Sequence, residues 1–511
     1  MKDKELKIGV ILSYLSIFIT NIISIIYTPI MLRLLGQSEY GLYTLVTAVI
    51  SYLGLFSFGF DSAFIRYYSR YKVKDEKEKI YNLNGMFLII YTILALLTII
   101  SGIFLINNTE LVFGNKLSIS QIGEAKILMA FMVFNIALSF PASVFNSNIT
   151  ANEKYIFQKV VGIFNSILSP MIMLPLLILG FKSISLVIAS TVMSITSLTI
   201  NIYYCIKKLN MKVYFNKMDF NLMGEISIFS LYIFMNMIVD QINWSVDKYL
   251  LGIMRGTTAV AIYGIGSQFN SYYITFSTAI SNVFIPKINR MSVENDNKKL
   301  TDLFINVGRV QFFVLILILT GYIIFGKYFI CVWAGEKYLE SYYIGLILMI
   351  PITIPLIQNV GIEIQRAKNM HKFRSIIYCI IVVINVIVSI PLCKKWGGIG
   401  CVIGTAIGIV IGNIIIMNIY YQKKVGIDIL RFWRNILKCV PIIILALIFG
   451  IVLVNIIKIN SLINFIAGVI IYIIGYFSIL WKFALNNNEK IFVKNIYMNL
   501  KRKVYHDRCK I

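Results

Sequence analysis

The chain opens with the stretch MKDKELKIGVILSYLSIFITNIISIIYTPIMLRLL (residues 1–35), in which three lysines precede an apolar run that starts at Ile8. The hydrophobic part of a signal peptide is roughly 7–15 residues long and ends at a small-residue cleavage site. A transmembrane helix needs about 20 apolar residues. This run is too long for a signal peptide and lacks such a site, so it is predicted to be the first transmembrane helix.

The composition of the whole chain agrees with a lipid environment. Of 511 residues, 58% are hydrophobic and 14% are charged, whereas a soluble domain has about 25% charged residues. The net charge of +25 would suggest nucleic acid in a soluble protein, but here the basic residues lie in short runs between apolar stretches. We therefore expect an all-α integral membrane protein with no nucleic-acid partner.

Fourteen stretches are long and apolar enough to be predicted as transmembrane helices. They cover residues 8–35, 41–60, 85–106, 127–149, 156–179, 184–205, 226–253, 258–285, 303–325, 342–364, 375–393, 398–420, 439–457 and 462–484.

The basic residues predict the orientation of these helices, because Lys and Arg gather on the cytoplasmic side of membrane helices. With the N-terminus inside and strict alternation, 37 of the 48 Lys and Arg residues fall on the inner side. A missed helix would disturb this alternation from that point onward. We expect a multi-pass protein of the bacterial cytoplasmic membrane with both termini in the cytoplasm.

The sequence also contains an internal repeat. Residues 43–70 match residues 263–290 at an offset of 220, and further matches lie at an offset of 216. We therefore predict two six-helix bundles, 1–210 and 211–425, as parallel pseudo-repeats. Two additional transmembrane helices, 426–486, and a basic cytoplasmic tail, 487–511, would follow. Transporters with such repeats bind substrate near the membrane midplane and alternate access between two sides.

Three motifs carry a family resemblance. Residues 33–43 (RLLGQSEYGLY) resemble the R-x-L-G-x-x-E-Y-G-x-Y signature of polysaccharide-unit flippases. Residues 58–66 (FGFDSAFIR) are similar to the L-G-x-x-x-A-x-x-R motif of that family, and residues 247–264 to its D-x-x-x-L-G and G-x-Y motifs. These flippases belong to the multidrug/oligosaccharidyl-lipid/polysaccharide exporter superfamily.

The resemblance implies a V-shaped pair of six-helix bundles around a charged central cavity. It implies that the cargo is a polyprenyl-diphosphate-linked oligosaccharide repeat unit, exported for surface polysaccharide assembly. The implied partners are membrane lipid and the polysaccharide polymerase or glycosyltransferases of the same pathway.

Polar residues in the seventh predicted helix form a stripe. Asn236, Asp240, Asn243 and Asp247 follow at spacings of 4, 3 and 4, which places them on one helix face. Charges inside membrane helices usually face a cavity or a partner, so the stripe is predicted to line a hydrated cavity or couple an ion. Hydrogen bonding between tightly packed helices is the alternative.

A diphosphate cargo also needs cations, and arginine suits forked phosphate contacts. Ordinary snorkelling at helix ends is the alternative role for these side chains. The cargo-binding candidates are Arg33, Arg66, Lys248, Arg255 and Arg366, and the further cavity candidates are Asp61 and Glu363. For Glu363 and Arg366, which are three residues apart on one predicted helix, a local ion pair is the favoured alternative.

Two other functions compete with the flippase. A cation-coupled drug or small-molecule antiporter of the same superfamily would use Asp240 or Asp247 as its ion site. A membrane polymerase or glycosyltransferase would need a catalytic acid or base in a sizeable outer loop, and the outer loops are short. The chain has two histidines and no metal-ligand cysteine spacing, so neither catalysis, a cofactor nor a metal is expected.

Overall fold

The computed structural model describes residues 2–215, 220–294, 296–368, 370–487 and 489–491. Every regular element within these ranges is a helix. Twelve segments are long and apolar enough to cross a membrane. The predicted all-α membrane fold is therefore confirmed. The predicted basic tail, 487–511, lies outside the described residues from position 492 onward.

The twelve segments differ from the fourteen predicted spans in two places. Helix α10 (Thr257–Asn282) is not among the twelve, and its sequence is rich in hydroxyl and amide side chains that lower its hydropathy. Two predicted spans, 375–393 and 398–420, fall within the single segment Lys372–Val425. The number fourteen stays a prediction.

Packing divides the chain into two compact units. Unit 1 comprises Met1–Gln268 and Ser375–Gly408, and unit 2 comprises Phe269–Arg374 and Ile409–Ile511. These units are defined by contacts rather than by the sequence repeat. The repeat boundaries, 1–210 and 211–425, stay predictions.

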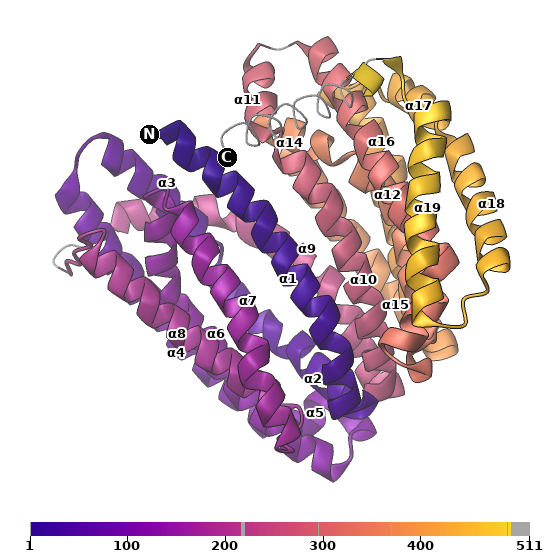
Figure 1. Cartoon of the computed structure of the whole chain (residues 1–511). Coiled ribbons are helices and arrows are strands. Elements are labelled where there is room, and N and C mark those ends of the chain that lie inside the picture. The colour runs from indigo at the N-terminus through magenta and orange to yellow at the C-terminus, as the bar shows by residue number, and fades with distance from the viewer. Residues whose placement is uncertain (1, 216–219, 295, 369, 488, 492–511) are drawn as a thin grey trace, which may run out of the picture. The chain divides into compact units, whose positions relative to one another are not determined.

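Unit 1 is built from long helices that pack along one another. Helix α1 runs beside α7 (Figure 1). Helix α6 packs against both α4 and α8, and α2 packs on α9. The elements that begin in this unit are α1 (Lys2–Leu35), α2 (Gln37–Ile50), η1 (Ser51–Ser57), α3 (Phe60–Val73), α4 (Lys77–Asn107), α5 (Thr109–Phe113), η2 (Gly114–Lys116), α6 (Ile119–Ala151), α7 (Tyr155–Ile178), α8 (Ile184–Lys207), α9 (Phe220–Arg255) and α10.

An aromatic cluster forms part of the core of unit 1. Phe64 of α3 meets Phe87 of α4 edge to face, with the ring centroids 5.1 Å apart. Tyr91 stacks on Phe140 of α6 at 6.3 Å. Large buried rings contribute packing energy beyond their apolar area, so this cluster fixes α3, α4 and α6 against one another.

Unit 2 is organised around the long helix α12, which packs on α13, α18 and α19. Phe325, Leu453 and Tyr472 form a buried cluster between α12, α18 and α19. The other elements here are α11 (Ile285–Val293), α12 (Asn297–Trp333), η3 (Glu336–Tyr338), α13 (Glu340–Ile357), α14 (Asn359–Ala367), η4 (Val410–Ile416), α16 (Met417–Tyr420), η5 (Tyr421–Val425), α17 (Ile429–Leu437), α18 (Val440–Ile457) and α19 (Leu462–Phe483).

Helix α15 (His371–Ile409) folds back on itself at Gly397, whose φ of 58° is not helical. A Cβ atom on Gly400 would collide with the Leu392 carbonyl, and one on Gly404 would collide with Ser389. The two arms therefore run antiparallel in close contact. Gly400 and Gly404 therefore form a packing surface between the arms, as small residues do between membrane helices.

Candidate functional site

The predicted stripe on α9 divides into an exposed part and a buried part. Asn236, Asp240 and Asn243 are exposed on the helix surface. Ser375 of α15 donates a hydrogen bond of 2.9 Å to the Asn236 side-chain oxygen. Asp247, the last member, is only 3% exposed. The four side chains therefore lie in different environments although they share one face of the helix.

Asp247 is held by hydroxyl groups from two other helices. Tyr263 of α10 and Thr405 of α15 each donate a hydrogen bond of 2.7 Å to Oδ2 of this carboxylate. Asn385 in turn donates to the Thr405 hydroxyl over 3.3 Å. Within the described residues, no Lys or Arg lies at ion-pairing distance from Asp247.

This setting gives Asp247 a defined chemical capacity. A buried carboxylate is costly in a membrane span unless protons, cations or hydrogen-bond donors compensate it. Here neutral hydroxyls supply the donors, so the group can accept a proton or a monovalent cation without first breaking a salt bridge. Lys248, the next residue in the chain, is half-buried.

The cargo-binding candidates are spread over α1, α3, α9 and α14. Arg33 is exposed in the last turn of α1, and the Arg66 guanidinium lies 4.6 Å from the centre of the Phe229 ring. Arg255 donates to the carbonyl oxygens of Cys393 and Lys394, at 3.4 and 2.6 Å. It thus caps the backbone just before the bend in α15.

The remaining candidates are held by local contacts. Arg366 belongs to unit 2 and forms an ion pair of 2.8 Å with Glu363, three residues earlier on α14. Asp61 lies in the first turn of α3 and accepts a hydrogen bond from the Tyr91 hydroxyl of α4.

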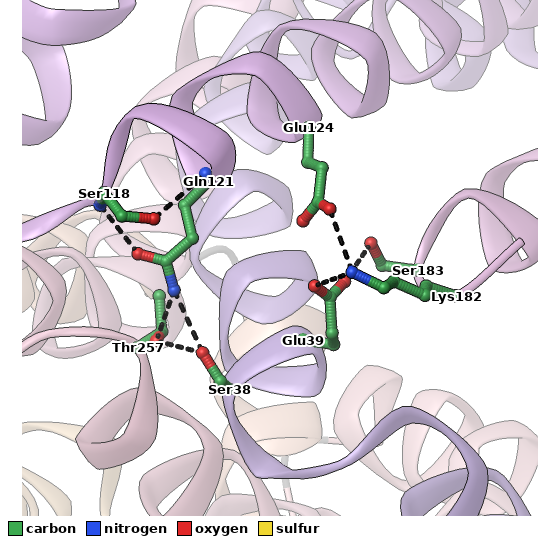
Figure 2. A network of polar contacts seen from close by, with 8 residues as sticks. All are labelled: Ser38, Glu39, Ser118, Gln121, Glu124, Lys182, Ser183 and Thr257. Carbon is green, nitrogen blue, oxygen red and sulfur yellow. Dashed lines mark hydrogen bonds and ion pairs between the residues drawn. The ribbon is translucent and has the colours of Figure 1, made fainter.

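The RLLGQSEYGLY signature forms a junction that sequence reasoning did not predict (Figure 2). Its residue Glu39 accepts a hydrogen bond of 2.9 Å from Ser183, in the loop between α7 and α8. Lys182 of the same loop bridges Glu39 and Glu124 of α6, at 3.5 and 3.2 Å. Glu39 at the start of α2 thus contacts the loop between α7 and α8, and Lys182 of this loop also contacts α6.

A second part of the junction centres on Gln121 (Figure 2). Ser118 and Gln121 form a capping box that starts α6. The Gln121 amide nitrogen also donates to Ser38 at 2.9 Å and to Thr257 at 3.4 Å. The sequence signal for the capping box is Ser-x-x-Gln. Thr257 has no such local signal, because it lies 136 residues away.

The two glycines of the signature have separate roles in the same junction. Gly36 adopts φ +77° between α1 and α2, a conformation that side chains rarely tolerate. Gly41 is so close to α10 that an added Cβ would collide with the Thr257 carbonyl. The signature therefore encodes a chain reversal followed by a tight contact between α2 and α10.

Comparison with known proteins agrees with this architecture. Residues 30–343 match the family model described as polysaccharide biosynthesis protein. The chain is 21% identical over 419 residues to a Shigella flexneri protein named "Putative O-antigen transporter", covering 79% of this chain and 94% of that protein.

Solved structures extend the likeness to the fold. The chain is similar to a lipid II flippase MurJ in an inward closed conformation, with a TM-score of 0.71, 20% identity, and coverage of 92% of this chain and 99% of that one. It is also similar to an inward-facing multidrug resistance MATE family transporter of the MOP superfamily, with a TM-score of 0.63, 12% identity, and coverage of 78% and 93%. The chain therefore belongs to the polysaccharide biosynthesis protein family and has the fold of MOP superfamily transporters.

Proposed function

We propose that this protein is a flippase that moves a polyprenyl-diphosphate-linked oligosaccharide repeat unit across the bacterial cytoplasmic membrane for surface polysaccharide assembly. The family match over residues 30–343 carries this proposal. It is supported by the O-antigen transporter relative, which is matched over 94% of its length. The proposed orientation has both termini in the cytoplasm.

Transport would proceed by alternating access between two pseudo-repeat halves around a charged cavity, without covalent chemistry. The proposed diphosphate contacts are Arg33, Arg66, Lys248, Arg255 and Arg366. The Asp247 cluster is the proposed ion-coupling element, since a carboxylate whose partners among the described residues are hydroxyl donors can exchange a proton or cation as the surrounding helices move. The pathway's polymerase or glycosyltransferases are the proposed functional partners.

The test is deletion of the gene in its host, followed by mass spectrometry of lipid-linked glycans and measurement of surface polysaccharide. We expect the glycan lipid to accumulate and the polysaccharide to be lost. The wild-type gene should restore both, whereas a variant with Arg33, Arg66 and Arg255 changed to Gln should insert normally and fail. Lys74→Gln, which removes a positive charge at an exposed position of a loop, is the control and should restore both. Unchanged glycan lipids in the deletion strain would refute the flippase.

A cation-coupled antiporter of the same superfamily is the second candidate. It is favoured by the buried Asp247 carboxylate, which forms no ion pair with any described residue. Dye efflux that is lost in the deletion strain and in Asp247→Asn, with normal surface polysaccharide, would establish it instead.

A further inference from the structure

Unit 1 contains a cavity of about 360 Å³ between α3, α6, α7 and α8. Small-molecule sites commonly occupy 300–1,000 Å³, and this volume suits a single sugar ring. Hydroxyl and amide side chains dominate the lining. These are Ser143, Ser147, Thr150, Asn146, Gln158 and Asn201.

The amide side chains of the lining hold one another in place. Asn201 of α8 donates to the Asn146 side-chain oxygen over 3.2 Å. Gln158 of α7 donates to the Thr150 hydroxyl over 2.7 Å and to the Asn146 carbonyl over 3.2 Å. Three helices therefore present a fixed polar wall, and a preorganised site binds with a smaller loss of conformational freedom.

The wall also has hydrogen-bonding capacity that the protein leaves unused. Ser147 is 4% exposed and Asn201 is 6% exposed. Across the described residues, the Ser147 hydroxyl has no hydrogen-bond partner, and the Asn201 side-chain oxygen accepts no hydrogen bond. Neither atom is among the fully buried unpaired atoms of the described residues, and both residues line the cavity. Both atoms are therefore open to hydrogen bonds from a molecule that enters it.

Asp61 makes the cavity selective. One of its oxygens accepts the Tyr91 hydroxyl bond, while the other accepts no hydrogen bond from any residue that the structure describes. Among the described residues, the lining holds this carboxylate and no Lys or Arg. A diphosphate would be repelled here, whereas sugar hydroxyls can donate to the carboxylate and exchange hydrogen bonds with the amides. Ile65 and Val161 add apolar surface for the C–H face of a ring.

We propose that this cavity binds one neutral sugar residue of the transported glycan, separately from the cations that bind its diphosphate. The proposal rests on the flippase function. It assigns the sugar to amide and hydroxyl groups of α6, α7 and α8 together with Asp61 of α3.

The test compares two probes on the purified full-length protein in lipid nanodiscs. One probe is undecaprenyl diphosphate, and the other is the glycan-bearing lipid extracted from the deletion strain. Removing two sugar contacts in the variant Ser147→Ala/Asn201→Leu should weaken binding of the glycan lipid about tenfold. Binding of undecaprenyl diphosphate should change less than twofold, which also shows that the variant is folded.

The matched control variant, Ser139→Ala/Asn165→Leu, changes the same residue types on α6 and α7 outside the cavity. It should bind both probes like the wild type. Equal weakening of both probes by the cavity variant, or no weakening of either, would overturn the sugar site. If the wild type binds neither probe, the proposed flippase function itself fails, and the sugar site fails with it.

A labelling experiment separates the sugar from a cation. In Ser143→Cys, the glycan lipid should slow reaction of the new thiol with a maleimide, while replacing choline chloride by sodium chloride should not. Protection by sodium without protection by the glycan lipid would make the cavity a cation site and overturn the proposal.

Discussion

The Thr405 hydroxyl donates a hydrogen bond of 2.7 Å to the Asp247 carboxylate, although 158 positions separate the two residues. This bond joins α15 to α9, and Tyr263 completes the cluster from α10.

Thr405→Val removes this donor while keeping the shape of the side chain. We expect the free energy of unfolding to fall by about 1–3 kcal/mol, because the buried carboxylate loses one of its two donors. Thr191→Val is the matched control, since Thr191 bonds only to a carbonyl of its own helix. Thermal unfolding of the purified proteins measures both. Equal losses would show that the Asp247 cluster is not a special stabilising element.

Asp247→Asn keeps the size of the side chain and removes its ability to bind a proton or cation. Transport, read as restoration of surface polysaccharide in the deletion strain, should fall at least about tenfold if coupling uses this group. Asp240→Asn, on the exposed part of the same stripe, is the control and should retain more activity. The opposite ranking would move the coupling site to Asp240.

Gly41→Ala places a methyl group against the Thr257 carbonyl. Because backbone atoms there cannot move independently of α10, we expect a loss of about 1–3 kcal/mol. Gly54→Ala is the control, since nothing lies within 4 Å of its added Cβ, and its effect should stay within about 0.5 kcal/mol. Similar melting temperatures for the two variants would contradict the tight contact.

Ser183→Ala should lower the free energy of unfolding more than Lys182→Gln does, although Lys182 forms ion pairs and Ser183 forms a hydrogen bond. The Ser183 residue is fully buried, and a hydrogen bond to a carboxylate contributes about 1.5–3 kcal/mol. The Lys182 side chain is 57% exposed, and such ion pairs contribute about 0–1 kcal/mol. Thermal unfolding at low and high salt distinguishes them, because only the Lys182 contribution should shrink with salt.

The Lys182 contribution should also depend on pH in one direction. Its hydrogen bond to Glu124 raises the pKa of Lys182 above the ordinary value. A raised lysine pKa adds stability that is complete below the unfolded-state pKa and is lost as the pH rises through the folded-state pKa. Lys182→Gln should therefore approach wild-type stability at strongly alkaline pH. A difference that persists there would point to lost packing instead.

The orientation can be measured with cysteine substitutions and a membrane-impermeant maleimide on intact cells. Lys116→Cys should react from outside, and Lys74→Cys should react only after permeabilisation, because Lys and Arg gather on the cytoplasmic side. Both positions are exposed. The parent protein with its native cysteines supplies the background. The reverse pattern would invert the proposed topology.

The sequence alone determined the membrane fold and most helix positions. The predicted spans 184–205 and 462–484 correspond to helices Ile184–Lys207 and Leu462–Phe483. A segment in lipid must be long and apolar and must form its backbone hydrogen bonds internally. Each of these requirements applies to one segment at a time, so the composition of that segment is enough to predict it. The predicted span 342–364 was less accurate, because the chain breaks at Gln358 after Pro351 and Pro355.

Only the tertiary structure decided which polar groups meet. Spacing placed Asp247 on one face with Asp240, but packing buried the first and left the second exposed. The signature around Glu39 can be recognised in the sequence as a motif. Its partners Ser183 and Lys182 lie more than 140 positions away, so the motif does not predict them. The cavity beside Asp61 likewise draws its lining from four helices. Hydropathy determines each helix separately, whereas the partner of a polar side chain depends on how the helices pack together.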